Sequence, residues 1–145
     1  MKNKYNIILI WLGLTMSGCF DVVAHNHAQH AFQSQQSIIK AIYLEDSLLN
    51  HKHKNEYIAL MKKAVQESKF AKRSELNGIY NNWGDMFHDY LIKGAQLTIE
   101  GDAESDPKIS LQKLTQANEY INKYSQWFNE NAIEMEEKIP VTKKL

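Results

Sequence analysis

The chain has few residues that form crosslinks or interrupt helices, and no excess of charge of either sign. It contains one cysteine, two prolines and six glycines in 145 residues, and its formal net charge is zero. A single cysteine excludes a disulfide within the chain and a haem attached through a cysteine pair. Few prolines and glycines leave few breaks, which favours helices. A balanced charge argues against general nucleic-acid binding, which needs a basic surface. The length is that of one domain, whose stability must come from packing.

Long apolar runs are missing as well. The apolar stretch of residues 7–14 is much shorter than the roughly 20 residues needed to cross a bilayer. Two lysines, Lys2 and Lys4, precede it, and small residues follow it. This order of positive, apolar and small residues is typical of a secretory signal peptide.

Four residues make this signal more specific, because Met16-Ser17-Gly18-Cys19 resembles the lipobox of bacterial lipoprotein signal peptides. The resemblance implies cleavage before Cys19, diacylglycerol on its thiol and acylation of the new terminus. Two or three acyl chains would anchor the protein stably. In that family, aspartate directly after the cysteine implies inner-membrane retention, and here Phe20 takes that place. We therefore expect the outer membrane, with the domain facing the periplasm, or the cell membrane of a single-membrane host. An ordinary signal peptide or uncleaved anchor with an incidental cysteine is the alternative.

The chain accordingly divides into a signal peptide (1–18), the lipidated cysteine with a tether (19–26), one helical-bundle domain (27–140) and a basic tail (141–145). Apolar residues recur at spacings of three, four and seven within the domain, which predicts amphipathic helices. We expect these helices at about 27–50, 57–68, 76–97 and 107–139.

The sequence marks two of the three connections between these helices clearly and the third one poorly. A polar turn at 51–54 and an acidic loop at 100–106 separate the first pair and the last pair. Asp106 is placed to cap the last helix, Pro107 suits its first position, and Pro140 ends it. The second and third helices have no proline between them, and Asn77-Gly78 either caps one helix or lies within another.

These elements predict an all-α, up-and-down bundle of four helices, and three helices with one long kinked helix are the alternative. In the four-helix topology, the turn at 51–54 and the loop at 100–106 lie at the end away from the tether. Lys72, Arg73 and the C-terminal lysines lie at the tether end.

Two histidine clusters are candidate metal ligands: His25, His27, His30, His51 and His53. Imidazole binds zinc, copper and nickel, but about 22 helical residues, or roughly 33 Å, separate the clusters, so they cannot share one ion within a chain. Solvated polar residues are the simpler interpretation. A weak divalent site between the distal histidines and three acids, Asp102, Glu104 and Asp106, is a further hypothesis. A calcium loop is rejected, because Pro107 and Lys113 replace its glycine and glutamate.

Asp85 and His88, three residues apart, are interpreted as a surface pair, because a di-iron bundle would need a second such motif. Aromatic residues are the better candidates for function. One stripe, made by Tyr80, Trp83, Phe87 and Tyr90, is most simply core. On the last helix, Tyr120, Tyr124 and Trp127 form a second stripe beside the one through Ile121 and Phe128. Core packing is the leading explanation of this stripe, and a partner-binding surface is the functional hypothesis.

No nucleophile elbow or phosphate loop is present in the sequence. We therefore expect no cofactor other than the covalent lipid, and a non-catalytic envelope lipoprotein that contacts a protein partner as an accessory, exclusion or inhibitor subunit. A metal-binding or metal-sensing lipoprotein that uses the histidine clusters is the alternative.

Overall fold

The computed structural model describes residues 22–45 and 53–138, and every regular element in these ranges is helical. The elements are α1 (Val22–Glu45), α2 (Lys54–Ser68), α3 (Arg73–Ile79), α4 (Trp83–Met86), the π-helical segment η3 (Phe87–Ile92), α5 (Lys93–Ala103) and α6 (Pro107–Lys138). The prediction of an all-α fold is therefore confirmed. The predicted signal peptide (1–18), Cys19, His51 and the basic tail lie outside the described residues.

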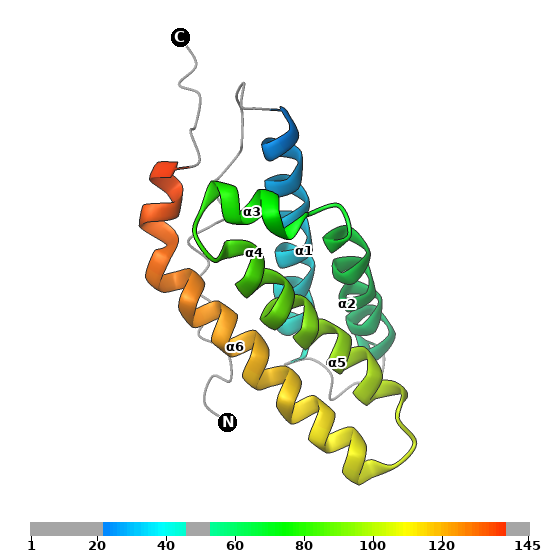
Figure 1. The fold of residues 1–145 in the computed structure, drawn as a ribbon. Coiled ribbons are helices and arrows are strands. Elements are labelled where there is room, and N and C mark those ends of the chain that lie inside the picture. The colour runs from blue at the N-terminus through cyan, green and yellow to red at the C-terminus, as the bar shows by residue number, and fades with distance from the viewer. Residues whose placement is uncertain (1–21, 46–52, 139–145) are drawn as a thin grey trace.

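Four long rods make the bundle, because α4, η3 and α5 follow one another without a break. In Figure 1, α1 packs along α2 and α5 packs along α6, with successive rods running in opposite directions. The contact between α2 and α5 joins the two pairs. The short α3 crosses one end of the bundle, close to the first half of α1. The up-and-down arrangement is as predicted, with one short helix more than expected.

The predicted helix at 76–97 is wrong in its first part, because the chain leaves the helical conformation between α3 and α4. Tyr80 is extended, at φ −144° and ψ 134°, and Asn82 lies in the left-handed region at φ 64°. Asparagine tolerates that region better than most residues, since its short polar side chain bonds locally. The long kinked helix is wrong too, because residues 69–72 separate α2 from α3. Asn77-Gly78 lies within α3.

Other helix ends agree more closely with the sequence. The Asp106 carboxylate accepts hydrogen bonds from the backbone N–H groups of Lys108, at 2.8 Å, and Ile109, at 3.2 Å, so the predicted cap is confirmed. At the other end of the chain, α1 begins at Val22 rather than at residue 27. No proline or glycine stands between these positions, so nothing in the sequence stops the helix from starting early.

The predicted polarity of the bundle is confirmed by one ion pair. Lys54 Nζ lies 3.0 Å from Asp102 Oδ1, so the start of α2 and the end of α5 meet at the same end. The start of α1 and the α2–α3 turn lie at the opposite end, where His27 contacts the backbone of Phe70.

Aromatic side chains from three rods fill the core. Trp83 and Phe87 are fully buried, with the Trp83 ring 5.3 Å from that of Phe32 and the Phe87 ring 6.4 Å from that of Tyr124. Small buried residues on α1 let it approach α2, where the Ser34 hydroxyl donates to the Ala64 carbonyl at 2.8 Å. Of the helices described, none has the length and apolar character needed to cross a bilayer.

Candidate functional site

The first notable feature is how closely α3 approaches α4. A Cβ atom at Gly84 would lie 2.1 Å from the Arg73 carbonyl oxygen, so only glycine fits at this contact. From α3, the Asn77 side-chain oxygen accepts hydrogen bonds from the N–H groups of Gly84, at 2.7 Å, and Asp85, at 3.3 Å. Asn77 thus caps α4 from another helix, and α3 is held against the start of the third rod.

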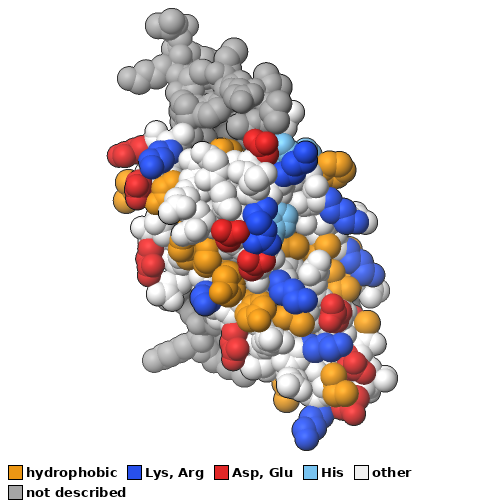
Figure 2. All heavy atoms as spheres, viewed as in Figure 1, with side chains coloured by type: hydrophobic (Ala, Val, Ile, Leu, Met, Phe, Trp, Pro, Cys, Tyr) orange, Lys and Arg blue, Asp and Glu red, His pale blue; other side chains and the backbone are white. Residues whose placement is uncertain are grey.

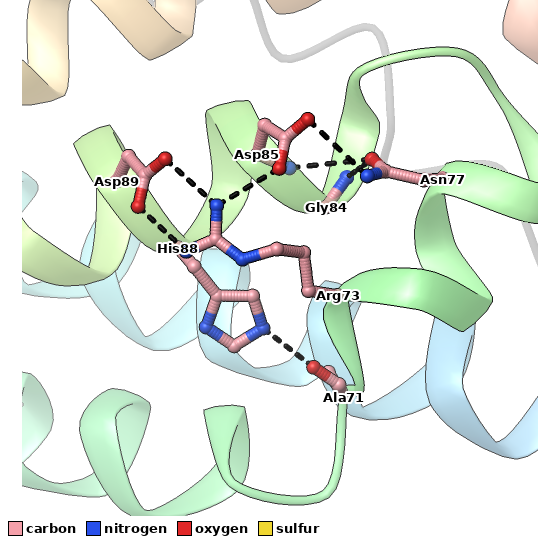
Figure 3. A network of polar contacts seen from close by, with 7 residues as sticks. All are labelled: Ala71, Arg73, Asn77, Gly84, Asp85, His88 and Asp89. Atoms are coloured by element: carbon pink, nitrogen blue, oxygen red, sulfur yellow. Dashed lines mark hydrogen bonds and ion pairs between the residues drawn. The ribbon is translucent and has the colours of Figure 1, made fainter.

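Arg73 links α3 to the two acids of that rod (Figure 3). Its guanidinium donates to Asp85 at 2.8 Å and to both carboxylate oxygens of Asp89 at 2.7 and 2.6 Å. The hydrogen bond from Arg73 holds the pKa of Asp89 below its usual value, and the same bond raises the pKa of Arg73. Both carboxylates are therefore bound to a cation, and this arrangement braces two helices.

His88 makes the third link of this network. Its Nε2 lies 2.6 Å from the Ala71 carbonyl oxygen and donates to it across the α2–α3 turn (Figure 3). Burial lowers the pKa of His88, and the hydrogen bond to Ala71 opposes that shift only in part. The predicted pair between Asp85 and His88 is not what the structure contains, because Asp85 bonds to Arg73 and Asn77 while His88 bonds to Ala71.

Both His88 and Asp89 lie in η3, whose backbone is wider than an α-helix. A π-helical turn carries one residue more than an α-helical turn and is frequent at functional sites. Here Phe87, Leu91 and Ile92 are buried, while Asp89 is exposed beside Arg73. The segment packs against α6, and Asp89 joins it to Arg73 of α3.

Aromatic rings lie along the contact between α6 and the third rod. We call the partly exposed rings of Tyr90, Tyr120 and Trp127, together with the buried ring of Tyr80 against which Trp127 packs, the aromatic seam. The Tyr90 and Tyr120 rings are 5.6 Å apart, and those of Tyr80 and Trp127 are 6.1 Å apart. Figure 2 shows hydrophobic side chains gathered in the middle of this face, with cationic and acidic side chains around them.

Polar bonds fix two rings of the seam. The Lys123 ammonium donates to the Tyr90 hydroxyl at 3.0 Å and lies 4.5 Å from the centre of its ring. The Tyr80 hydroxyl lies 2.8 Å from a carboxylate oxygen of Glu134, and this hydrogen bond raises the pKa of Tyr80. The seam therefore combines apolar area with polar groups at fixed positions.

The three aromatic residues of the partner hypothesis divide between surface and core. Tyr120 and Trp127 are partly exposed. Tyr124 is only 2 % exposed, so a surface role for it is wrong. Its hydroxyl donates to Gln35 on α1 at 2.9 Å, and burial raises its pKa. Tyr124 lies within the buried stripe of α6, at three and four residues from Ile121 and Phe128.

The histidines of the metal hypothesis make separate contacts. His27 Nδ1 lies 2.6 Å from the Phe70 carbonyl oxygen, His30 Nδ1 lies 2.8 Å from the Glu67 carboxylate, and His53 lies 3.4 Å from Glu56. The side chain of His25 and the whole of His51 are outside the described part of the chain. In that part, no three histidine, cysteine, aspartate or glutamate side chains converge as metal ligands do. Metal binding stays a prediction.

The three acids near His53 are also engaged elsewhere. Asp102 pairs with Lys54, Glu104 accepts from the Asp106 N–H at 3.2 Å, and Asp106 caps α6. Their positions are explained by charge balance and helix capping.

The serine and threonine hydroxyls, like these acids, make hydrogen bonds that stabilise the fold. In the described ranges, the hydrogen-bonded serine and threonine hydroxyls donate to backbone carbonyls: Ser34, Ser68, Thr98, Ser110, Thr115 and Ser125. A nucleophile in a hydrolase would instead donate to a base such as histidine. The hydrogen bonds around η3 join it to α3 and to the α2–α3 turn.

Sequence reasoning missed Arg73, Asn77 and Asp89 as members of one network. Asp85 and Asp89 carried a signal, since acids four residues apart share a helix face. Arg73 carried none, because its partners lie 12 and 16 residues away across a helix break. Comparison with models of protein families finds none that matches the chain, and comparisons with curated proteins and with solved structures find no match either.

Proposed function

We propose that this protein is a non-catalytic envelope lipoprotein that binds a protein partner through the aromatic seam, as an accessory, exclusion or inhibitor subunit. The partly exposed rings of Tyr120 and Trp127 are the observation that carries the proposal. Tyrosine and tryptophan are enriched where proteins bind one another, because each has a large apolar body and a polar tip.

The surroundings of the seam support protein contact over other uses. Lys123 fixes Tyr90, and Glu134 fixes the buried Tyr80 against which Trp127 packs. A partner would therefore meet exposed rings that have already lost much of their motion. The charged side chains that surround it in Figure 2 would provide the polar rim found around interface centres.

The lipobox supplies the other half of the proposal. Acylation of Cys19 would hold the bundle at the periplasmic face of the outer membrane, or on the cell membrane of a host with one membrane. The seam lies along the side of the bundle, so it would stay accessible to a neighbouring envelope protein (Figure 2). Mass spectrometry of the mature terminus tests this half, and a Cys19 that carries no lipid contradicts it.

Site-specific crosslinking in intact cells tests the seam. A photoreactive phenylalanine at Tyr120 or Trp127 should give one discrete adduct, while the same residue at exposed Glu119 or Gln126 should give none. Glu119 and Gln126 each precede a seam residue on α6, so they control for expression and membrane proximity. Equal adducts from all four positions, or none from the seam, would contradict the proposal.

A Lys123→Glu variant sharpens the test. It removes the ammonium that holds Tyr90, and Lys123 is itself exposed, so we expect the fold to persist and the adduct to weaken. Circular dichroism and a thermal scan check the fold. An unchanged adduct would show that the partner does not depend on the ordered seam.

A further inference from the structure

The turn between α2 and α3 presents a large apolar side chain to solvent. Phe70 is 60 % exposed, and both Lys69 and Lys72 beside it are exposed as well. Within the described residues, neither lysine makes an ion pair with an acid. Residues 69–73 contain three basic side chains and no acid. An exposed ring between unpaired lysines is the combination that suits an anionic lipid surface.

The exposure of Phe70 is imposed by contacts on both sides of it. His27 Nδ1 lies 2.6 Å from the Phe70 carbonyl oxygen and 3.2 Å from the Lys72 amide nitrogen. As an N–H it donates to the carbonyl, and as a bare nitrogen it accepts from the amide, so either tautomer holds the turn. His88 donates to the next carbonyl, that of Ala71, at 2.6 Å. The backbone at Phe70 is therefore fixed from α1 and from η3.

The ring itself rests on α1 and not in the core. Its centre is 5.1 Å from that of His30, whose Nδ1 donates to Glu67 at 2.8 Å. Glu67 is the acid of α2 that is nearest to the turn in sequence, and its carboxylate is bonded to His30 and not to a lysine of the turn. The outer face of the ring is left to solvent, beside lysines without acidic partners.

The turn also lies where the proposed anchor would place a membrane. Val22 is the third residue after Cys19, a span of about 10 Å at most in an extended chain. From Val22 to His27, α1 rises about 7.5 Å. Because His27 contacts Phe70, the ring is held within roughly 30 Å of the acylated residue by this chain of contacts, once the reach of the two side chains is added.

We propose that residues 69–72 dock on an anionic lipid surface, with Phe70 entering the interfacial layer and Lys69 and Lys72 contacting lipid phosphates. This inference rests on the proposed lipid anchor. Docking of a second point would fix the tilt of the bundle, which a single point of attachment does not do. The aromatic seam would then face sideways along the membrane, toward neighbouring proteins.

The opposite end of the bundle provides a matched control. Leu111 is 67 % exposed, close to the value for Phe70, but it follows an acidic segment. Residues 100–106 contain four acids and no base. Lys54 and Lys113 pair with three of these acids, so that end offers no unpaired basic cluster beside its exposed apolar residue. An anionic surface would therefore attract the α2–α3 turn far more than this end, and apolar exposure alone does not decide which end binds.

The test uses the full lipid-modified chain, labelled with fluorinated phenylalanine and reconstituted in vesicles of phosphatidylethanolamine and phosphatidylglycerol. A nitroxide on the lipid headgroups broadens fluorine signals that lie near the surface. A Phe70→Leu variant assigns the Phe70 signal, and buried Phe87 provides an internal reference. A Leu111→Phe variant places the same probe at the acidic end.

We expect several-fold more broadening at Phe70 than at Phe87 or at position 111. Replacing phosphatidylglycerol by phosphatidylcholine, or introducing Lys69→Glu and Lys72→Glu, should remove most of the difference, since each lysine near an anionic surface contributes about fivefold in binding. If the chain sediments with vesicles but Phe70 stays as sharp as Phe87, the docking is wrong and the anchor stands. If Cys19 is unmodified and the chain does not sediment, the anchor and the docking both fail.

Discussion

At the α5–α6 turn, the groups that close the chain reversal lie close together in sequence, whereas at the α2–α3 turn they come from distant elements. Asp106 caps α6 two and three residues ahead of it, and the Ser110 hydroxyl donates to the Gly101 carbonyl at 2.6 Å. The α2–α3 turn instead depends on His27, which is 43 residues from Phe70, and on His88, which is 17 residues from Ala71.

The difference matters for stability and for function. A turn closed by its own residues keeps most of its stability when another part of the protein changes, because that stability comes from local capping hydrogen bonds. A turn held by α1 and η3 depends on the packing of the whole end of the bundle. The α2–α3 end also carries the contacts that bring Arg73 to its two acids, so its order and that of the site are linked.

Gly84→Ala should break the α2–α3 end and have the largest effect. The added Cβ would lie 2.1 Å from the Arg73 carbonyl oxygen, which is backbone and must move. We expect a loss of roughly 3 kcal/mol in the free energy of unfolding, at the upper end for overpacked sites. Gly78→Ala is the control: nothing lies within 4 Å of its Cβ position, so about 0.5–1 kcal/mol should be gained. Urea denaturation measures both, and equal effects would contradict the close approach of α3.

Asp106→Ala should weaken the α5–α6 end by about 1 kcal/mol, the usual cost of losing an N-cap. The backbone N–H groups of Lys108 and Ile109 lose their acceptor and turn to water. Ser105→Ala, one residue earlier and exposed, should change stability by less than about 0.5 kcal/mol. The fluorine signal of Phe70 should not move in either variant. A shift there would mean that the two ends are coupled after all.

Arg73→Gln should cost up to about 1 kcal/mol, because the paired side chains are 44–55 % exposed and solvent screens them. The lowered pKa of Asp89 gives the sign of the pH dependence. Its stabilisation is complete above the unfolded value of about 3.9 and is lost as pH falls through the folded pKa. The urea midpoints of the wild type and of the Arg73→Gln variant should therefore converge as the pH is lowered from 7 toward 3. A constant difference would exclude the ion pair as the cause.

Lys113→Gln makes the corresponding change at the α5–α6 end. Its ammonium is 3.5 Å from Glu104 and 3.8 Å from Glu100, longer than the contacts of Arg73. We expect a smaller loss than for Arg73→Gln. A larger one would reverse the ranking of the two ends.

His88→Gln tests the histidine link with the smallest expected effect. Burial lowers the pKa of His88, so the folded state favours the neutral ring. As pH falls below the unfolded value of about 6.5, the unfolded chain takes up the proton first, and stability is lost down to the folded pKa. Glutamine retains a donor toward Ala71 without titrating. The wild type should therefore lose more stability than the variant between pH 7.5 and pH 5.5, and equal slopes would contradict this assignment.

How far the sequence predicted each region follows from the range of its interactions. Asp106 and Pro107 marked the start of α6 because a cap acts within one turn of helix. The network of Arg73, Asp85 and Asp89 could not be predicted, since it depends on the break at Asn82 and on the close approach at Gly84. Neither feature leaves a periodic pattern in the sequence.

The aromatic residues show the same limit. Periodicity placed Tyr120, Tyr124 and Trp127 on neighbouring positions of one helix, but it did not say which of them faces inward. The structure buries Tyr124 because α6 packs against η3 and Tyr124 reaches Gln35 on α1. Tyr120 and Trp127 stay at the edge of that contact.

By itself, then, the sequence determined that the chain is helical, where three of its four rods lie, and which turns share an end, because apolar spacing, caps and chain breaks are local properties. Only the tertiary structure decided that α3 folds back on the third rod, that His27 and His88 hold the α2–α3 turn, and that Tyr124 belongs to the core. Those outcomes depend on how closely two helices approach each other, and that distance is set by side chains far apart in the sequence.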